Sequence, residues 1–471
     1  MKTALEKFFE PRSVTVVGAS ATPGKGGNDI IRNLLSNEYR GRLYLVNPRG
    51  GEILGIPVFK SISELPEASD LAVLVLPASA SLQALKECAE KGIHAAVLVA
   101  GGFAEVDHQG EELQGEMAKL ARETGMRLLG PNTSGLLSMP RNLAASFFPL
   151  GKIPRGNISY IAQTGNFATH TMRYIMSAEH YGVARVVGLG NKVDVDESEV
   201  LEYLGADPET GAVLLYLESF KRPRRFLEVA RQVTGRKAVL LLKGGSTERG
   251  ARAAVTHTAA MAADERLVGA ALRQAGVVRM SKYTHLVLAA KALALAPLPR
   301  GRTVGILAPS GAMAVCMTDL CERELNLTVP DLQEKTRIRL QAMSPPFIRM
   351  RNPVDIWPSA TIHGAEKAYR EAMEAVLMDA HVDALVGILM MTDETGAPPL
   401  DFILDLAHRF PEKPIYVSCS GQKKHMEAAK AFLEPGGVPT FWFAEEAFEA
   451  LHFAVQCRQA MERKGRHDNE A

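Results

Sequence analysis

The chain has 471 residues, of which 46% are hydrophobic and 23% are charged, a composition typical of folded globular proteins. Lysine and arginine number 54 against 53 aspartate and glutamate residues, and a net charge of +1 argues against a nucleic-acid-binding protein. At about 150 residues per domain, this length predicts roughly three domains.

The cysteines are odd in number, scattered, and form no CxxC pair, which argues against a disulfide framework and against a zinc site. We therefore predict a cytoplasmic protein. The N-terminal segment lacks the apolar core of a signal peptide, and the apolar stretch 286–298 is interrupted by Lys291 and is too short to cross a bilayer. The five cysteines are Cys88, Cys316, Cys321, Cys419 and Cys457.

Short apolar runs that end at Gly, Pro or Asn alternate with helical segments over residues 1–130. Such runs are typical of parallel strands buried on both faces, and helical spacing occurs at Ser81–Lys91 and Glu111–Thr124. This pattern predicts a Rossmann-like domain over residues 1–130. The predicted strands lie at Val14–Ser20, Leu43–Pro48, Leu71–Pro77, Ala95–Gly102 and Arg127–Asn132.

An internal repeat organises the rest of the chain. Four matching segments in the same order predict two related doubly wound α/β domains, at 131–297 and 302–460, followed by a charged tail at 461–471. The stretch Pro297–Arg302 is the predicted linker. The matching pairs are Ile158–Ala168 with Val304–Ala314, Asn191–Val195 with Asn352–Ile356, Val213–Ser219 with Gly387–Asp393, and Lys237–Gly245 with Lys413–Gly421.

The first repeat carries about fifteen extra residues after Lys237–Gly245, and this insertion contains His257. Insertions that follow the carboxyl end of a strand are where α/β proteins place their chemistry. A lone histidine is more often structural, but the small neighbours of His257 leave its ring able to reach a phosphoryl donor. Glu218, at the end of another strand, would serve as its partner by fixing the tautomer; alone, Glu218 would be interpreted as a helix cap.

The turn Gly18–Gly27 follows a predicted strand and precedes a predicted helix, an arrangement that suits a phosphate ligand. Its spacing is not GxGxxG, and the second strand ends in Asn47-Pro48 where NAD-binding proteins usually have an acidic residue. Lys25 and Arg49 favour a nucleotide with an additional phosphate. CoA fits this description, and NADP fits nearly as well.

Two further segments carry polar residues after strands. Gln163-Thr164-Gly165 opens a helix, so its backbone amides and the Thr164 hydroxyl are candidates for holding an oxyanion. Ser310-Gly311 has the same form in the other repeat and is a candidate secondary version of this site. Asp194 and Asp196 lack the rest of a metal-ligand set, so we predict solvated capping and no metal site.

Seven segments together resemble the α subunit of NDP-forming acyl-CoA synthetases, the ADP-forming acetate–CoA ligases related to succinyl-CoA synthetase. The resemblance extends to about residue 455. It implies an α/β fold with a Rossmann-like CoA-binding domain followed by two flavodoxin-like, doubly wound parallel-sheet domains. The segments are FFEPRSVTVVGAS, LYLVNP, LGPNTSG, AQTGN, GLGNKVDVDE, LLYLES and THTAAMA.

The resemblance also implies a ligase that interconverts acyl-CoA, ADP and phosphate with a carboxylic acid, CoA and ATP through acyl phosphate and phosphohistidine. His257 would carry the phosphoryl group, Glu218 would stabilise it, and Gln163, Thr164 and Gly165 would hold phosphate. The CoA site would be lined by Gly18, Ala19, Ser20, Lys25, Asn47, Pro48, Pro77, Gly101 and Asn132.

The sequence departs from the family pattern at Thr133, where the family commonly has Cys, at Ala259, where it commonly has Gly, and at the bulkier Asn166-Phe167. No P-loop occurs, and no segment after residue 460 is long enough for an ATP-grasp module. We therefore expect Mg-ATP or ADP to bind a separate ATP-grasp β subunit, in a heterotetramer. Short aliphatic, branched, aromatic and dicarboxylic acids remain open as substrates.

Two alternatives remain open from the sequence. The departures and the missing ATP-grasp module are compatible with a non-catalytic CoA- or acyl-CoA-binding regulatory protein, although His257 and Glu218 are both retained. The Rossmann-like start alone is compatible with an NADP-dependent oxidoreductase.

Overall fold

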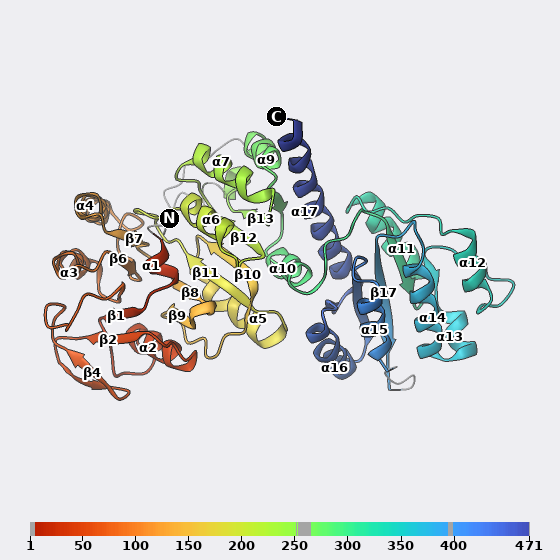
Figure 1. Cartoon of the computed structure of the whole chain (residues 1–471), viewed down its shortest axis with the longest axis horizontal. Coiled ribbons are helices and arrows are strands. Elements are labelled where there is room, and N and C mark those ends of the chain that lie inside the picture. The colour runs from red at the N-terminus through yellow and green to blue at the C-terminus, as the bar shows by residue number, and fades with distance from the viewer. Residues whose placement is uncertain (1–4, 251, 253–264, 394–398, 471) are drawn as a thin grey trace. The chain divides into compact units, whose positions relative to one another are not determined.

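The computed structural model describes residues 5–250, 252, 265–393 and 399–470. Contacts divide the chain into two compact units, Met1–Ser281 and Lys282–Ala471. Within the described residues, the first unit holds two seven-stranded sheets and the second unit holds one five-stranded sheet (Figure 1).

The first sheet has the order β3-β4-β2-β1-β5-β6-β7 and is parallel except for the β3–β4 pair. Alternate residues of β5 belong to two hydrophobic clusters, one shared with α2 and the other with α3 and α4, so both faces are covered. All five strands predicted here are confirmed, whereas the β3–β4 hairpin was not predicted. The elements are α1 Glu6–Phe9, β1 Ser13–Val17, α2 Gly26–Ser36, β2 Arg42–Val46, β3 Gly51–Ile53, β4 Ile56–Phe59, β5 Leu71–Leu74, α3 Ala78–Lys91, β6 Ala95–Leu98, α4 His108–Thr124 and β7 Arg127–Leu129.

The second sheet has the order β14-β13-β12-β10-β11-β8-β9, in which only the pairs made by β8 are antiparallel. Its central strands β10, β11, β12 and β13 are apolar and buried, as the sequence predicts for a parallel sheet. The elements are β8 Gly135–Ser138, β9 Leu143–Ser146, β10 Arg155–Ala162, the π-helical turn Phe167–Thr171, α5 Met172–Ala178, β11 Val183–Gly188, α6 Glu197–Ala206, β12 Ala212–Leu217, α7 Pro223–Thr234, β13 Ala238–Lys243, α9 Glu265–Gln274 and β14 Val278–Met280.

The third sheet repeats the topology of the second. Its order β16-β15-β17-β18-β19 is that of β11-β10-β12-β13-β14. Both are the 2-1-3-4-5 order of flavodoxin-like domains, the fold that the family resemblance implies. The elements are α10 His285–Leu295, β15 Val304–Ala308, α11 Gly311–Arg323, α12 Glu334–Gln341, β16 Val354–Asp355, α13 Trp357–His363, α14 Ala365–Leu377, β17 Ala384–Met391, α15 Asp401–Arg409, β18 Ile415–Gly421, α16 Lys423–Leu433, β19 Thr440–Phe441 and α17 Ala444–Glu470.

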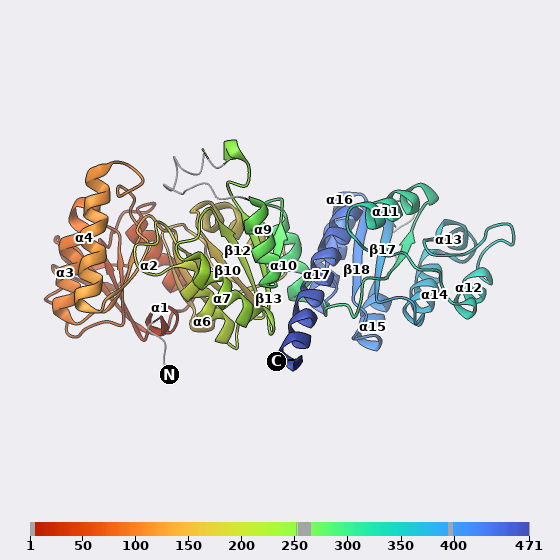
Figure 2. The same ribbon diagram turned by 90° about the horizontal axis from the view of Figure 1, so that it is seen from above.

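The helix α10 belongs to the second unit, although the sequence places the boundary after it, at Pro297–Arg302. It packs against α17 (Figure 1, Figure 2), and the buried Lys291 Nζ donates to the Thr440 carbonyl at 2.8 Å and lies 3.0 Å from Glu434 Oε1. The boundary between the two compact units therefore lies before α10. The charged tail expected at 461–471 continues α17 as far as Glu470.

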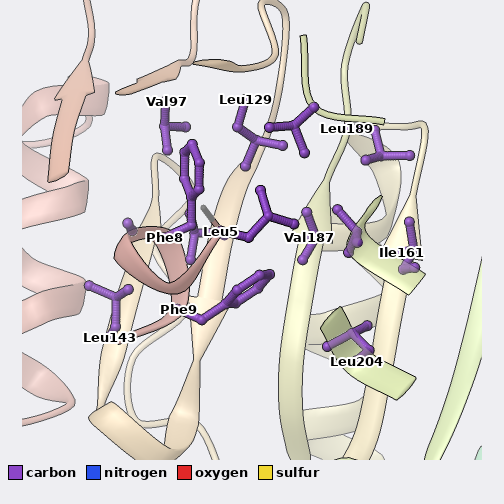
Figure 3. Close-up of a cluster of buried hydrophobic side chains, with 14 of the residues drawn as sticks. Leu5, Phe8, Phe9, Val97, Leu129, Leu143, Ile161, Val187, Leu189 and Leu204 are labelled. Atoms are coloured by element: carbon purple, nitrogen blue, oxygen red, sulfur yellow. The ribbon is translucent and has the colours of Figure 1, made fainter. Parts of the chain in front are cut away.

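The two sheets of the first unit share one hydrophobic core. Phe8 and Phe9 of α1 lie between Val97 and Leu129 of the first sheet and Val187 of the second (Figure 3). Burial of such side chains is worth about 1.5–3 kcal/mol each, which explains why these two sheets form a single compact unit. Within the described residues, no helix combines the length and apolarity that crossing a membrane requires.

A buried arginine in the second sheet forms hydrogen bonds and ion pairs with the end of α1. Arg185 of β11 is 1% exposed; it lies 2.7 Å from Glu10 and 3.2 Å from Asp207, and it donates to the Phe9 carbonyl at 3.1 Å. Burial alone would raise the pKa of Asp207, but hydrogen bonds and charge from Arg185 outweigh it and hold the pKa below its ordinary value.

Replacing Arg185 by Met is expected to lower the free energy of unfolding by about 3–5 kcal/mol, because it leaves buried carboxylates without their cation. Hydrogen–deuterium exchange of peptides from β11 and α6 will measure the loss. The control Arg225→Met breaks a more exposed pair with Glu202 and should cost about 1 kcal/mol or less. Equal protection in both variants would contradict this prediction.

Candidate functional site

The residues predicted to line the CoA site all lie at one edge of the first sheet. Each follows the carboxyl end of a strand, and all five of these strands run parallel, so the loops emerge on the same side. Gly18, Ala19, Ser20 and Lys25 follow β1, Asn47 and Pro48 follow β2, Pro77 follows β5, Gly101 follows β6, and Asn132 follows β7.

The glycine-rich turn after β1 is closely packed at Gly18 and Gly27 and exposed at residues 21–25. Gly18 has φ +90°, and a Cβ there would lie 2.3 Å from the Val75 carbonyl oxygen. A Cβ on Gly27, in the first turn of α2, would lie 2.2 Å from the Gly18 oxygen. Lys25, which precedes the helix, is exposed. The glycines thus bring the N-terminus of α2, with its backbone N–H groups, against the strand end, where it suits an anionic ligand.

Replacing Gly18 by Ala should cost about 3 kcal/mol of unfolding free energy, because the added Cβ meets backbone and φ is positive. Urea unfolding followed by circular dichroism checks this. Gly115→Ala, on α4 where a Cβ meets nothing within 4 Å, is the matched control and should be neutral or stabilising. The packing argument fails if the two variants unfold alike.

Asn47 supports this turn from the neighbouring strand. Its Nδ2 donates to the Ala19 carbonyl at 2.9 Å, and its Oδ1 accepts from the Arg49 N–H at 2.9 Å. The Asn47 side chain therefore holds the shape of the turn, while the adjacent Pro48 and the more distant Pro77 are exposed at the same edge.

Glu105 was not predicted, yet it fixes the loop after β6. Its Oε1 accepts from the Gly102 N–H at 2.8 Å, and its Oε2 accepts from Asn191 Nδ2 at 2.5 Å. Burial alone would raise the pKa of Glu105, but these hydrogen bonds outweigh it and place the pKa below its ordinary value. A Cβ on Gly101 would lie 3.1 Å from Glu105 and 3.3 Å from Asn132, so the predicted residues Gly101 and Asn132 are neighbours.

The loop after β11 joins the two sheet edges. The Asn191 N–H donates to the Pro131 carbonyl and the Val193 N–H to the Gly130 carbonyl, both at 2.9 Å. Thr133, buried where the family commonly has Cys, donates its hydroxyl to the Gly188 carbonyl at 2.6 Å. The departure at Thr133 is therefore accommodated by a hydrogen bond within the fold.

A second group of predicted residues lies at the carboxyl edge of the second sheet. Gln163 follows β10 and Glu218 follows β12, and the Gln163 Oε1 accepts from the Glu218 N–H at 3.0 Å and from the Ser219 N–H at 3.1 Å. The Gln163 side chain thus connects the two strand ends, because its nitrogen also donates to Ser219 Oγ at 3.1 Å. That the backbone amides of residues 163–165 hold phosphate stays a prediction.

Glu218 is half-buried, and a tyrosine contacts its carboxylate while a lysine contacts its backbone. Tyr216 donates its hydroxyl to Glu218 Oε1 at 3.2 Å, and Lys243 Nζ donates to the Glu218 carbonyl at 2.8 Å. Burial lowers the pKa of Lys243. His257, the predicted partner of Glu218, lies outside the described residues, as does Ala259, so the predicted pair stays a prediction.

The segment after Gln163 opens a helical turn, as predicted. Thr164 Oγ1 accepts from the Asn166 N–H at 3.2 Å, and Gly165 is exposed with nothing within 4 Å of an added Cβ. The first turn, Phe167–Thr171, is π-helical before α5 begins. Phe167 is buried against Tyr160, with ring centroids 4.4 Å apart, so this bulky departure fills the core.

Asp194 and Asp196 have structural partners. Asp196 caps α6 by accepting from the Ser198 N–H at 2.9 Å, as predicted, but it is buried and paired with Arg222 at 2.6 Å where solvated capping was expected. Asp194 pairs with Arg127 at 2.8 Å. Among the described residues, no group of three or more His, Cys, Asp or Glu side chains is arranged to hold a metal ion.

Comparison with known proteins agrees with this arrangement. Residues 12–139 match the CoA binding domain family, and residues 155–293 match the succinyl-CoA ligase like flavodoxin domain family. The chain is 34% identical to subunit alpha of acetate–CoA ligase [ADP-forming] II from Pyrococcus furiosus, over 96% of this chain and 97% of the relative.

Two further relatives extend the comparison. Acetate–CoA ligase [ADP-forming] II from Archaeoglobus fulgidus is 36% identical over 93% of this chain, which spans 64% of that relative's length. The solved structure of Ca. Korarchaeum cryptofilum dinucleotide forming acetyl-coenzyme A synthetase 1, in complex with phosphate and ADP, matches with a TM-score of 0.90 at 31% identity over 98% of each chain.

These relatives favour the ligase prediction over the regulatory and oxidoreductase alternatives. Family membership rests on the nearly full-length match to an α subunit at more than 30% identity and on the two domain families found in order along the chain. The chain therefore belongs to the family of ADP-forming acetate–CoA ligases, whose CoA-binding and succinyl-CoA-ligase-like domains it carries.

Proposed function

We propose that this chain is the α subunit of an ADP-forming acyl-CoA synthetase, which interconverts acyl-CoA, ADP and phosphate with a carboxylic acid, CoA and ATP. The observation that carries the proposal is its alignment with nearly the whole α subunit from Pyrococcus furiosus. The loops at the carboxyl edges of both sheets in the first unit support it, because they gather the residues expected for CoA binding and for phosphoryl transfer.

CoA binds, in this proposal, at the carboxyl edge of the first sheet. The exposed Lys25 and the N–H groups at the start of α2 suit its phosphates. The turn itself is exposed at residues 21–25. The remaining loops complete the lining. The proposed CoA residues are Gly18, Ala19, Ser20, Lys25, Asn47, Pro48, Pro77, Gly101 and Asn132.

Two group transfers follow. An oxygen of inorganic phosphate attacks the thioester carbonyl, the C–S bond breaks, and CoA leaves as thiolate, giving acyl phosphate. A ring nitrogen of His257 then attacks phosphorus, the bond between phosphorus and the acyl oxygen breaks, and the carboxylate leaves. Thr164 and Gly165 hold the phosphate, Gln163 shapes their loop, and Glu218 accepts the proton on the other ring nitrogen of His257.

The nucleotide step is assigned to a separate ATP-grasp β subunit that binds Mg-ATP or ADP, in a heterotetramer. One observation supports this: the Pyrococcus furiosus relative, which matches over nearly its whole length, is itself a subunit alpha. We place the complex in the cytoplasm, since all five cysteines are free thiols.

Incubation of the full chain with acetyl-CoA and ³²P-labelled phosphate tests the proposal. We expect an acid-labile, base-stable label on the protein, together with release of CoA. Calorimetry should detect binding of CoA and none of NADP. Tight CoA binding without any label, even beside an ATP-grasp partner, would instead support the regulatory alternative.

A further inference from the structure

A lysine buried at the carboxyl edge of the second sheet connects three strand ends. Lys192, in the loop after β11, is 5% exposed, and its Nζ donates to the Ser219 carbonyl at 2.8 Å and to Gln163 Oε1 at 3.2 Å. It also donates to Ser219 Oγ at 3.2 Å and lies 3.1 Å from Glu197 Oε2. One ammonium group thus bridges residues that follow β10 and β12.

Holding Lys192 in this place is costly for the fold in two ways. Its φ of +56° lies in the left-handed region, which non-glycine residues seldom occupy. Burial lowers the pKa of its ammonium, and the carboxylates of Glu197, Asp196 and Glu218 oppose that effect. A strained backbone and a desolvated charge at one residue are typical of functional sites.

The contacts of Lys192 lead directly to Glu218. Gln163 Oε1, which accepts from Lys192, also accepts from the Glu218 N–H at 3.0 Å. Ser219, the next residue, receives two hydrogen bonds from the same ammonium group. The direction in which Glu218 leaves β12 therefore depends on Lys192. The neighbouring Asn191 holds the loop after β6 through Glu105, so this dipeptide also contacts the CoA edge.

We propose that Lys192 is a positioning residue for phosphoryl transfer, which fixes the course of the chain at Glu218 through Gln163 and Ser219. This inference rests on the proposed function. The competing explanation is a structural ion pair with Glu197 that only stabilises the sheet edge. The two explanations predict different rates of phosphoryl transfer in a variant that lacks the ammonium group but has regained its stability.

The test compares Lys192→Met with the double variant Lys192→Met/Glu197→Gln. The single change leaves Glu197 buried without its cation and should lower the melting temperature. The double change also removes the buried negative charge of Glu197, so it should restore most of the stability. The glutamine keeps an oxygen that can accept from the Lys221 N–H, as Glu197 Oε1 does at 2.8 Å. Single-turnover labelling from acetyl-CoA and ³²P-phosphate should stay about 10- to 100-fold slower than wild type in both variants. The acetyl-CoA concentration that gives the half-maximal labelling rate should change less than twofold.

Lys237→Met is the matched control, because this lysine is also partly desolvated but donates to the backbone carbonyls of Leu204 and Asp207, at the other end of the same sheet. It should label at the wild-type rate. If the double variant labels as fast as Lys237→Met, Lys192 has only a structural role and the inference is overturned. If the wild-type chain takes no label, the proposed function fails, and the inference fails with it.

Discussion

Replacing His257 by Asn will abolish the transfer of phosphate from acetyl-CoA and labelled inorganic phosphate onto the chain. Asparagine has about the same polarity but no ring nitrogen with a nucleophilic lone pair, so the covalent intermediate has no acceptor. Loss of a covalent nucleophile typically costs more than about 1000-fold in rate. Acid-labile label counted after gel filtration, with CoA binding followed by calorimetry, separates loss of chemistry from loss of the substrate.

The second unit offers a matched control for this variant. His425 Nε2 lies 2.9 Å from Asp393 Oδ1, so it is an imidazole paired with a carboxylate, the arrangement proposed for His257 and Glu218. Hydrogen bonds from Lys424 and His425 hold the pKa of Asp393 at about 2. His425→Asn should label as wild type does. Label that survives in His257→Asn and disappears in His425→Asn would move the phosphorylated residue to the second unit.

Replacing Glu218 by Gln should slow labelling about 100-fold, because the amide keeps an acceptor for the Tyr216 hydroxyl but carries no charge to stabilise a phosphorylated imidazolium. The effect should fall on the rate of the phosphoryl step in single-turnover experiments. The dissociation constant for CoA should stay within twofold of wild type, since Glu218 lies at the edge of the second sheet and the CoA loops belong to the first.

Glu202→Gln provides the comparison for Glu218→Gln. Glu202 lies on α6 of the same domain and pairs with Arg225 at 2.6 Å on the surface. This variant should label at the wild-type rate and melt at nearly the wild-type temperature. A similar rate loss in both variants would mean that Glu218 contributes charge to the domain as a whole and has no specific role beside His257.

Much of the fold is readable from the sequence because fully buried parallel strands leave continuous apolar runs. The five predicted strands of the first sheet and the matching strands of the repeat in the other two sheets follow from that rule. Short strands do not follow this rule: in β3, Gly51–Ile53, two of the three residues are exposed, and the strand pairs with β4 across a tight turn. The assignment of α10 also escapes it, because the contact of Lys291 with Thr440 joins residues 149 positions apart.

In the candidate site, too, some residues can be predicted from the sequence and others cannot. Residues at strand ends, such as Gly18 and Glu218, can be named from the sequence, because parallel strands bring their carboxyl ends to one edge. The side chains that support them cannot. Glu105 meets Asn191 across 86 positions, and Lys192 meets Gln163 across 29. Neither contact follows a helical or strand period, so no local pattern marks it.

The available chemistry can be read from the chain alone: a glycine-rich turn for an anion, a carboxylate after β12, and a histidine in an insertion found in only one repeat. The contacts that support these groups come from the fold. The Gln163 side chain bonds to Ser219 and to the Glu218 backbone, and Lys192, for which the sequence suggests no role, is a buried cation that joins them. This is because the hydrogen bonds of buried polar groups must be satisfied within the fold, and their partners come from distant strands.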